Sequence, residues 1–177
     1  SAAPAAPKAP QADPNKVYNV PDAGSVVLGN PDAKVTVIKW TDYQWPYCAR
    51  SVSLIDDILN KYPNDVKVVI KNFPLSFHKQ AMQAAKYGLA AHKQGKFKEM
   101  YHKIFDNYKD LKTNEKVPED YARDLGLNMN QFIQDAGSEE ISNQIISLSQ
   151  LREDIKTNQA LLKPLVYVQE FAKVNKK

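Results

Sequence analysis

The side chain with the most distinctive chemistry in this sequence is the thiol of Cys48, the one cysteine among 177 residues. It ends the stretch Trp45-Pro46-Tyr47-Cys48, where a β-branched run gives way to a helical pattern. A thiol at a helix N-terminus is favoured as the reactive thiolate, because the unpaired N–H groups there stabilise negative charge. Cys48 lies one turn into the predicted helix, where a lone thiol is expected to be packed and inert; the alternative is a single-thiol site that forms mixed disulfides with partners. Without a second cysteine, the chain can form neither an internal disulfide nor a multi-cysteine metal site.

The segments around Cys48 have the pattern of a βαβ unit. Residues 34–40 are rich in β-branched side chains and predict a central strand. Apolar residues then recur at helical spacing from about 48 to 62, and residues 66–71 predict a second strand. Two strands around one helix imply a parallel pair with a right-handed crossover. A short strand is also predicted at 17–20.

The rest of the chain is predicted to be mostly helical, with one last strand at 165–168. Asn128 and Ser138 are good N-caps for the last two helices, and Pro118 suits the first turn of the helix before them. The order is that of a two-lobed α/β protein with a helical block before its final strand. The predicted helices span 80–94, 96–108, 118–125, 128–135 and 138 to about 162.

Composition and charge argue against several classes of function. The net charge is +4, with 24 basic and 20 acidic residues interspersed, so a nucleic-acid-binding stripe is not expected. The sequence has no apolar run near the roughly 20 residues of a membrane span. Three histidines, His78, His92 and His102, lack metal-ligand spacing, and neither a metal nor another cofactor is predicted. Residues 1–16 form an Ala/Pro-rich spacer, predicted to be disordered, ahead of one domain at 17–177.

Several separated segments resemble the DsbA-like thioredoxin family of thiol-disulfide oxidoreductases. They include Thr41-Asp42-Tyr43-Gln44 before the helix, Lys71-Asn72-Phe73-Pro74-Leu75 followed by Phe77-His78, and Gln94-Gly95-Lys96-Phe97. The resemblance covers about residues 17–168. It implies an α/β thioredoxin-like fold with a helical insertion at about 78–160, and an exported, periplasmic protein.

Three departures from the family pattern accompany this resemblance. Trp45 stands where the family has its attacking cysteine, and Cys48 stands at the buried, resolving position. Lys163-Pro164 stands where the family has a Gly-x-Thr-Pro turn with a cis proline facing the cysteines. The family's final strand and closing helix are missing or shortened, which would leave an exposed sheet edge that a partner could complete.

These departures leave three functions open. The first is a redox-inactive, chaperone-like module that holds an extended peptide or protein in a groove lined by Trp45, Pro46, Tyr47, Lys163 and Pro164. The second is a thiol-disulfide oxidoreductase that works through Cys48 alone, with glutathione or another protein supplying the second thiol. The third is a structural subunit whose partner supplies the missing strand.

Overall fold

The computed structural model describes residues 20, 22, 24–157 and 166–169. The elements follow one another as one α/β unit, with a single 3₁₀ turn, η1, in the helical part. Their bounds are β1 Val26–Gly29, β2 Val35–Thr41, α1 Pro46–Lys61, β3 Val66–Asn72, α2 Ala81–Lys93, α3 Phe97–Asp106, η1 Asp110–Lys112, α4 Val117–Asp124, α5 Met129–Ala136, α6 Glu139–Thr157 and β4 Val166–Gln169.

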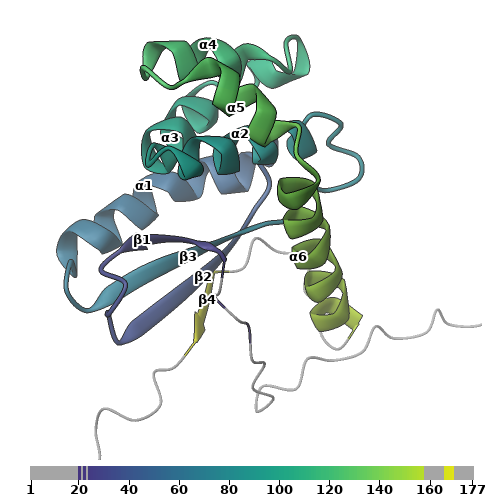
Figure 1. The fold of residues 1–177 in the computed structure, drawn as a ribbon. Coiled ribbons are helices and arrows are strands. Elements are labelled where there is room, and N and C mark those ends of the chain that lie inside the picture. Colours follow the sequence, from purple (N-terminus) through teal and green to yellow (C-terminus); the bar gives the residue numbers. More distant parts are fainter. Residues whose placement is uncertain (1–19, 21, 23, 158–165, 170–177) are drawn as a thin grey trace, which may run out of the picture.

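The four strands form one mixed sheet in the order β1-β3-β2-β4 (Figure 1). Strands β2 and β3 are parallel, in register from Val35 opposite Val66 to Thr41 opposite Asn72. This pairing confirms the predicted βαβ unit, with α1 as its crossover. The two outer strands are antiparallel to their neighbours, β1 to β3 and β4 to β2.

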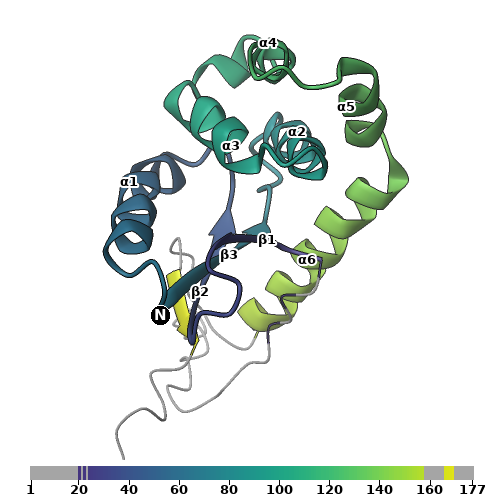
Figure 2. The same ribbon diagram turned by 60° about the vertical axis from the view of Figure 1, so that its left-hand side comes forward.

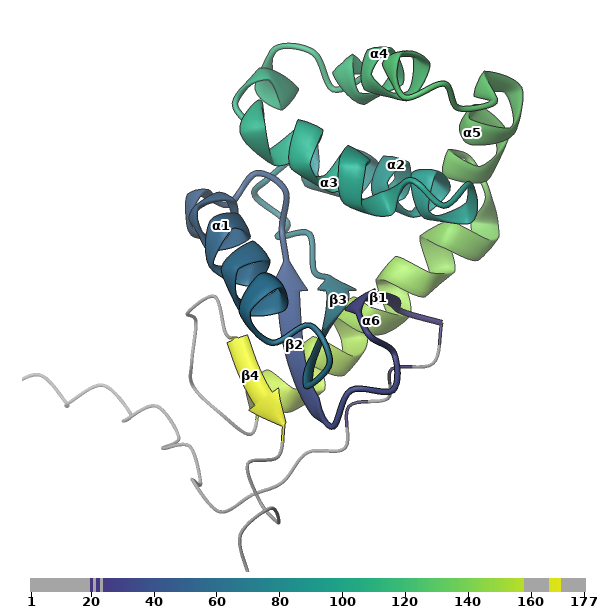
Figure 3. The same ribbon diagram turned by 90° about the vertical axis from the view of Figure 1, so that its left-hand side faces the viewer.

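Helices cover both sides of the sheet. Helix α1 lies on one side and α6 runs along the other, while α2 to α5 form a helical layer beyond the ends of β2 and β3 (Figures 2 and 3). The larger core lies on the α1 side, where Val52 and Ile55 pack with strand residues such as Val37 and Val68. At Gly29 a Cβ atom would come within 2.7 Å of the Leu59 side chain, so β1 packs closely on α1 only without a side chain there.

Most predicted elements are confirmed within a residue or two, including the caps. The Asn128 side chain accepts a hydrogen bond from Gln131 N at 3.1 Å, and Ser138 Oγ accepts one from Ile141 N at 3.3 Å. The sequence prediction missed β1. It placed a strand at 17–20 instead, and residues 17–19 lie outside the described residues. The predicted end of α6 near residue 162 also lies outside them.

Two further findings concern the described residues alone. None of their helices combines the length and the apolar character that a bilayer crossing requires. Among the same residues, no group of three or more histidine, cysteine or acidic side chains is arranged to hold a metal ion.

Candidate functional site

The site begins in the short loop that joins β2 to α1. Trp45 is the N-cap residue of α1 in an extended conformation, and Pro46 opens the helix, where its missing N–H leaves no donor unsatisfied. The Trp45 backbone N–H donates to Asp42 O at 3.2 Å, and the Trp45 carbonyl accepts from Ala49 N at 3.2 Å. The position of the indole is therefore set by the backbone on both sides.

The Asp42 carboxylate joins this loop to the segment that follows β3. One oxygen accepts the N–H of Gln44 at 2.7 Å; the other accepts the N–H of Leu75 at 2.7 Å and lies 2.9 Å from His78 Nδ1. Gln44 and Gln80 bond each other as well, since the Gln44 amide accepts from Gln80 N and donates to the Gln80 side chain, both at 2.8 Å. Asp42 is buried, so these bonds are shielded from water.

The joined loops present a group of aromatic rings, here called the aromatic cluster: Trp45, Tyr47, Phe77 and His78. The Trp45 ring centroid lies 6.0 Å from Tyr47, 6.2 Å from Phe77 and 5.6 Å from His78. The guanidinium of Arg50 lies over the Tyr47 ring at 4.2 Å, in cation–π geometry. Tyr47 is 54% exposed and Phe77 66% exposed, so the cluster offers apolar surface to a partner.

Cys48 lies one turn into α1 and faces the interior. It is only 4% exposed, and its Sγ lies 3.8 Å from the carbonyl oxygen of Trp40. Burial raises the pKa of the Cys48 thiol, against smaller opposing effects of the Asp42 backbone N–H and the Lys39 charge. A buried thiol with a raised pKa is a weak nucleophile near neutral pH.

A buried lysine lies beside this thiol. Lys39, on β2, is 2% exposed, and its ammonium donates to the carbonyl of Cys48 at 3.3 Å and to the hydroxyl of Tyr101. Burial lowers the pKa of Lys39 from 10.5 to about 8, and the charges of Cys48 and Asp56 raise it in part. Asp56 also lies 2.7 Å from His102 Nε2, which places an acidic side chain at the outer edge of this buried group.

The fold is similar to that of known proteins. The profile of a family described as thioredoxin matches residues 22–163. The chain belongs to the thioredoxin family. Among solved structures it is similar to a thioredoxin-like oxidoreductase from Silicibacter pomeroyi DSS-3, with a TM-score of 0.65 and 27% identity over 76% of this chain and 75% of that one.

Two more solved structures show that this thioredoxin-family chain has the DsbA-like form of the fold. One is α-DsbA1 of Wolbachia pipientis, with a TM-score of 0.65 and 20% identity over 76% of this chain and 70% of that one. The other is the catalytic domain of ScsC from Proteus mirabilis, with a TM-score of 0.65 and 23% identity over 83% and 78%. The predicted fold is thus confirmed.

Curated relatives of this thioredoxin-family chain carry a different name. It is 36% identical to the Na(+)/H(+) antiporter NhaA 1 of Mycolicibacterium gilvum over 110 residues, which are 62% of this chain and 18% of the antiporter. It is 29% identical to the Na(+)/H(+) antiporter NhaA of Herminiimonas arsenicoxydans over 112 residues, 63% of this chain and 17% of that protein. The chain spans less than a fifth of the length of these relatives.

The predicted site residues divide into two groups. The structure places Trp45, Pro46, Tyr47 and Cys48 together at the start of α1. Lys163 and Pro164 lie outside the described residues, so their place beside Trp45 stays a prediction.

The sequence reasoning did not assign to the site four residues that shape it: Lys39, Asp42, Phe77 and His78. Asp42, Phe77 and His78 do lie in segments that carry the family resemblance. One signal was available for Lys39. It lies two residues after Val37, and alternation along a strand puts both on the same face, toward α1. The positions of Asp42 and His78 depend on contacts between loops far apart in the sequence, for which the local pattern holds no signal.

Proposed function

We propose that this thioredoxin-family chain is a redox-inactive module that binds extended polypeptide, and that the aromatic cluster is its binding surface. The observation that carries the proposal is the exposed cluster around Trp45, at the helix start where the family resemblance places an attacking sulfur. An indole cannot form a disulfide. Trp45 is half-buried and Tyr47 is exposed. Tryptophan, tyrosine and arginine are the side chains that contribute most to binding at protein interfaces.

The burial of Cys48 supports the same proposal. A two-cysteine exchange cycle needs an accessible thiolate and a second sulfur, and the one thiol of this chain is 4% exposed with a raised pKa. The curated relatives bear the name of an antiporter, which exchanges ions across a membrane. Their likeness over part of this chain is consistent with an exported domain that works at the cell envelope.

The alternative function is thiol-disulfide exchange through Cys48 alone, and the observation that favours it is the nearby Lys39 cation. A Cys48 thiolate would attack glutathione disulfide, forming one new S–S bond while the old one breaks, and the departing glutathione thiolate would take up a proton. A substrate thiolate would then attack the glutathione sulfur of this mixed disulfide, so that the substrate leaves as a glutathione mixed disulfide and the Cys48 thiolate is regenerated. Such a cycle requires the buried thiol to become accessible.

Insulin reduction with glutathione separates the two functions. The binding proposal predicts that wild-type chain and Cys48→Ala give the same rate as buffer. Turnover by the wild type that disappears in Cys48→Ala would overturn it in favour of the oxidoreductase.

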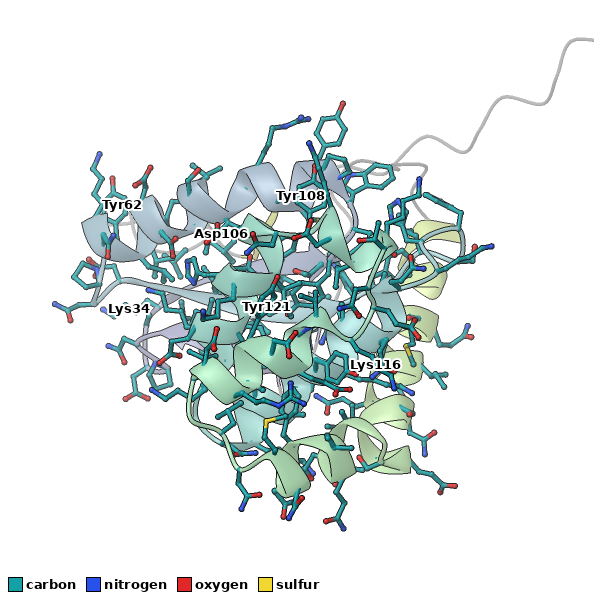
Figure 4. The ribbon with its side chains drawn as sticks, turned by 90° about the horizontal axis from the view of Figure 1, so that it is seen from above. Lys34, Tyr62, Asp106, Tyr108, Lys116 and Tyr121 are labelled. Carbon is teal, nitrogen blue, oxygen red and sulfur yellow. The ribbon has the colours of Figure 1, made fainter. Side chains whose placement is uncertain are left out.

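Binding itself is tested with a polypeptide that has no free thiol, reduced and carboxymethylated α-lactalbumin. We expect Trp45→Ala to weaken binding at least tenfold by titration calorimetry. The matched control is Tyr62→Ala, since Tyr62 is a 43% exposed aromatic residue just past the other end of α1. Figure 4 shows Tyr62 near Lys34, at the end of the molecule away from Lys116. Equal binding by the wild type and Trp45→Ala would contradict the proposal.

The structural alternative concerns the sheet edges. In the described residues β1 and β4 are the outer strands. A partner strand that completes the sheet at one of them stays a prediction. A strictly monomeric chain by light scattering would speak against an obligatory partner.

A further inference from the structure

The helical layer holds a small open cavity that shares no residue with the aromatic cluster. It lies between α2, α4 and α5, three helices that contact one another (Figure 1). Its volume is about 280 Å³. Pockets that hold drug-sized ligands measure roughly 300–1,000 Å³, so this cavity suits a smaller molecule.

Tyr87 of α2 holds the three helices in place around the cavity. Its ring stacks on Phe132 of α5, with the centroids 5.4 Å apart and the planes 11° apart. Its hydroxyl donates to the carboxylate of Glu119, on α4, at 2.7 Å. Burial raises the pKa of Tyr87, and the hydrogen bond to Glu119 and the charge of Glu115 raise it further. The cavity is therefore formed before a ligand arrives, which lowers the cost of binding.

The cavity wall carries charges of both signs. Lys86 and Lys116 line it, and neither ammonium group has a carboxylate partner within the described part of the chain. Lys86 is half-buried, which is an uncommon environment for an unpaired lysine. Glu115 and Glu119 line the same cavity. A ligand of a single sign would meet like charge here, whereas a zwitterion offers an opposite charge to both kinds of side chain.

The remaining wall is largely apolar. Ile133 and Ala136 are three residues apart on α5, so they lie on the same face of that helix. Ile133 is 50% exposed, although isoleucine is among the residues most often buried. An aliphatic group in the cavity would remove part of this isoleucine from water, which favours a ligand with an apolar side chain.

We infer that the cavity between α2, α4 and α5 binds a free α-amino acid with an aliphatic side chain. The carboxylate of the ligand pairs with Lys86 and Lys116. Its ammonium group pairs with Glu115 and Glu119, and its side chain packs on Ile133. The inference goes beyond the proposed function and does not depend on it, because no residue of the aromatic cluster takes part.

A titration of the full chain with L-leucine tests this inference, followed by the backbone amide resonances of Tyr87 and Gly137 at the cavity wall. Two analogues each lack one charge. 4-Methylpentanoate keeps the carboxylate and the aliphatic chain, and 3-methylbutylamine keeps the ammonium group and the chain. We expect each to bind about tenfold or more weakly than L-leucine, because each leaves charges of the cavity unpaired. No saturable shift with millimolar L-leucine, or equal affinity for either analogue, would overturn the inference.

Lys86→Met removes one cation and keeps the length of the side chain. We expect L-leucine to bind about tenfold more weakly and 3-methylbutylamine, which has no carboxylate, to bind no more weakly than to the wild type. The control is Lys112→Met in η1, an exposed lysine outside the cavity, which should leave both affinities unchanged. Wild-type affinity for L-leucine in Lys86→Met would contradict the assignment. If thermal melts show that Lys86→Met does not fold, the comparison of the analogues on the wild type decides.

Discussion

The exposed aromatic cluster and the buried group beneath it lie only one helical turn apart, yet their environments differ completely. Tyr47, in the first turn of α1, and Phe77, in the loop after β3, expose more than half of their surface. Beneath that turn, Lys39, Cys48 and Tyr101 are all buried. The rings of Tyr47 and Phe77 are thus accessible to a partner, while the Cys48 thiol is shielded from solvent. The fold thus buries the one thiol of the chain and leaves the neighbouring rings at the surface.

The largest change in redox behaviour is expected when a second cysteine is introduced at the start of α1. Trp45→Cys places a thiol at the N-cap of α1, where helix N–H groups stabilise a thiolate, three residues before Cys48. We expect a reversible disulfide between the two cysteines, where the wild type can form none. A glutathione redox titration followed by mass spectrometry measures it. A variant that stays reduced across the titration would show that more than Trp45 separates this chain from an exchange enzyme.

The buried side is probed by Lys39→Met. Between about pH 8 and pH 10.5, the unfolded chain keeps a proton on Lys39 that the folded chain has released. Raising the pH through this window therefore stabilises the wild type relative to the variant. With each pKa unit worth about 1.4 kcal/mol, the gain amounts to roughly 3 kcal/mol.

Urea unfolding at pH 7 and pH 10 measures most of this change in relative stability, because pH 10 lies within the window and just below the ordinary pKa of 10.5. A Lys39→Met difference that is flat with pH would contradict the lowering of the Lys39 pKa by burial.

The connection between the two regions is tested by Asp42→Asn. The amide has one acceptor oxygen where the carboxylate has two, so either the Leu75 or the Gln44 N–H loses its partner. We expect a loss of about 1–3 kcal/mol in the free energy of unfolding. Asp57→Asn, an exposed residue of α1, should stay within about 0.5 kcal/mol of the wild type. Equal effects in chemical denaturation would contradict the role given to Asp42.

Phe77→Ala should separate binding from stability. Phe77 is 66% exposed, so its truncation should change the free energy of unfolding by no more than about 0.5 kcal/mol. Affinity for carboxymethylated α-lactalbumin should fall about five- to tenfold. Calorimetric titration and thermal melts on the same preparation test both parts. A variant that loses stability instead of affinity would make Phe77 a structural residue.

The smallest effect concerns Tyr43, whose ring stacks on Phe105 at 4.9 Å beneath the loop. Within the described part of the chain, its buried hydroxyl has no hydrogen-bond partner. Tyr43→Phe should therefore be neutral or stabilise the fold by up to about 1 kcal/mol. The matched variant Tyr101→Phe removes a hydroxyl that Lys39 does bond, so it should destabilise. Thermal melts that place the two variants in the opposite order would contradict this assignment.

Much of the fold could be predicted from the sequence because its elements carry strong local signals. The β-branched runs of β2 and β3, the helical spacing of α1 and the N-caps Asn128 and Ser138 all act within a few residues. Strand β1 could not be found in this way. It has four residues, and its register is set by antiparallel pairing with β3, far along the chain.

The site was predictable only in part, for the same reason. Trp45 and Cys48 follow from the pattern at the end of a strand. The burial of Lys39 runs against its usual preference for solvent, and it depends on Tyr101, which comes 62 residues later in the sequence. The aromatic cluster likewise depends on contacts that join two loops, those of Asp42 and of the Gln44–Gln80 pair. Side chains brought together by tertiary contacts carry no local signal.

The main proposal is that the aromatic cluster binds polypeptide at the position where the family has its attacking cysteine. Comparing two variants in one binding assay tests it most directly. Cys48→Ser and Trp45→Ala would each be titrated with carboxymethylated α-lactalbumin, which offers no thiol. We predict wild-type affinity for Cys48→Ser and at least a tenfold loss for Trp45→Ala. Loss of binding in Cys48→Ser with retention in Trp45→Ala would contradict the account.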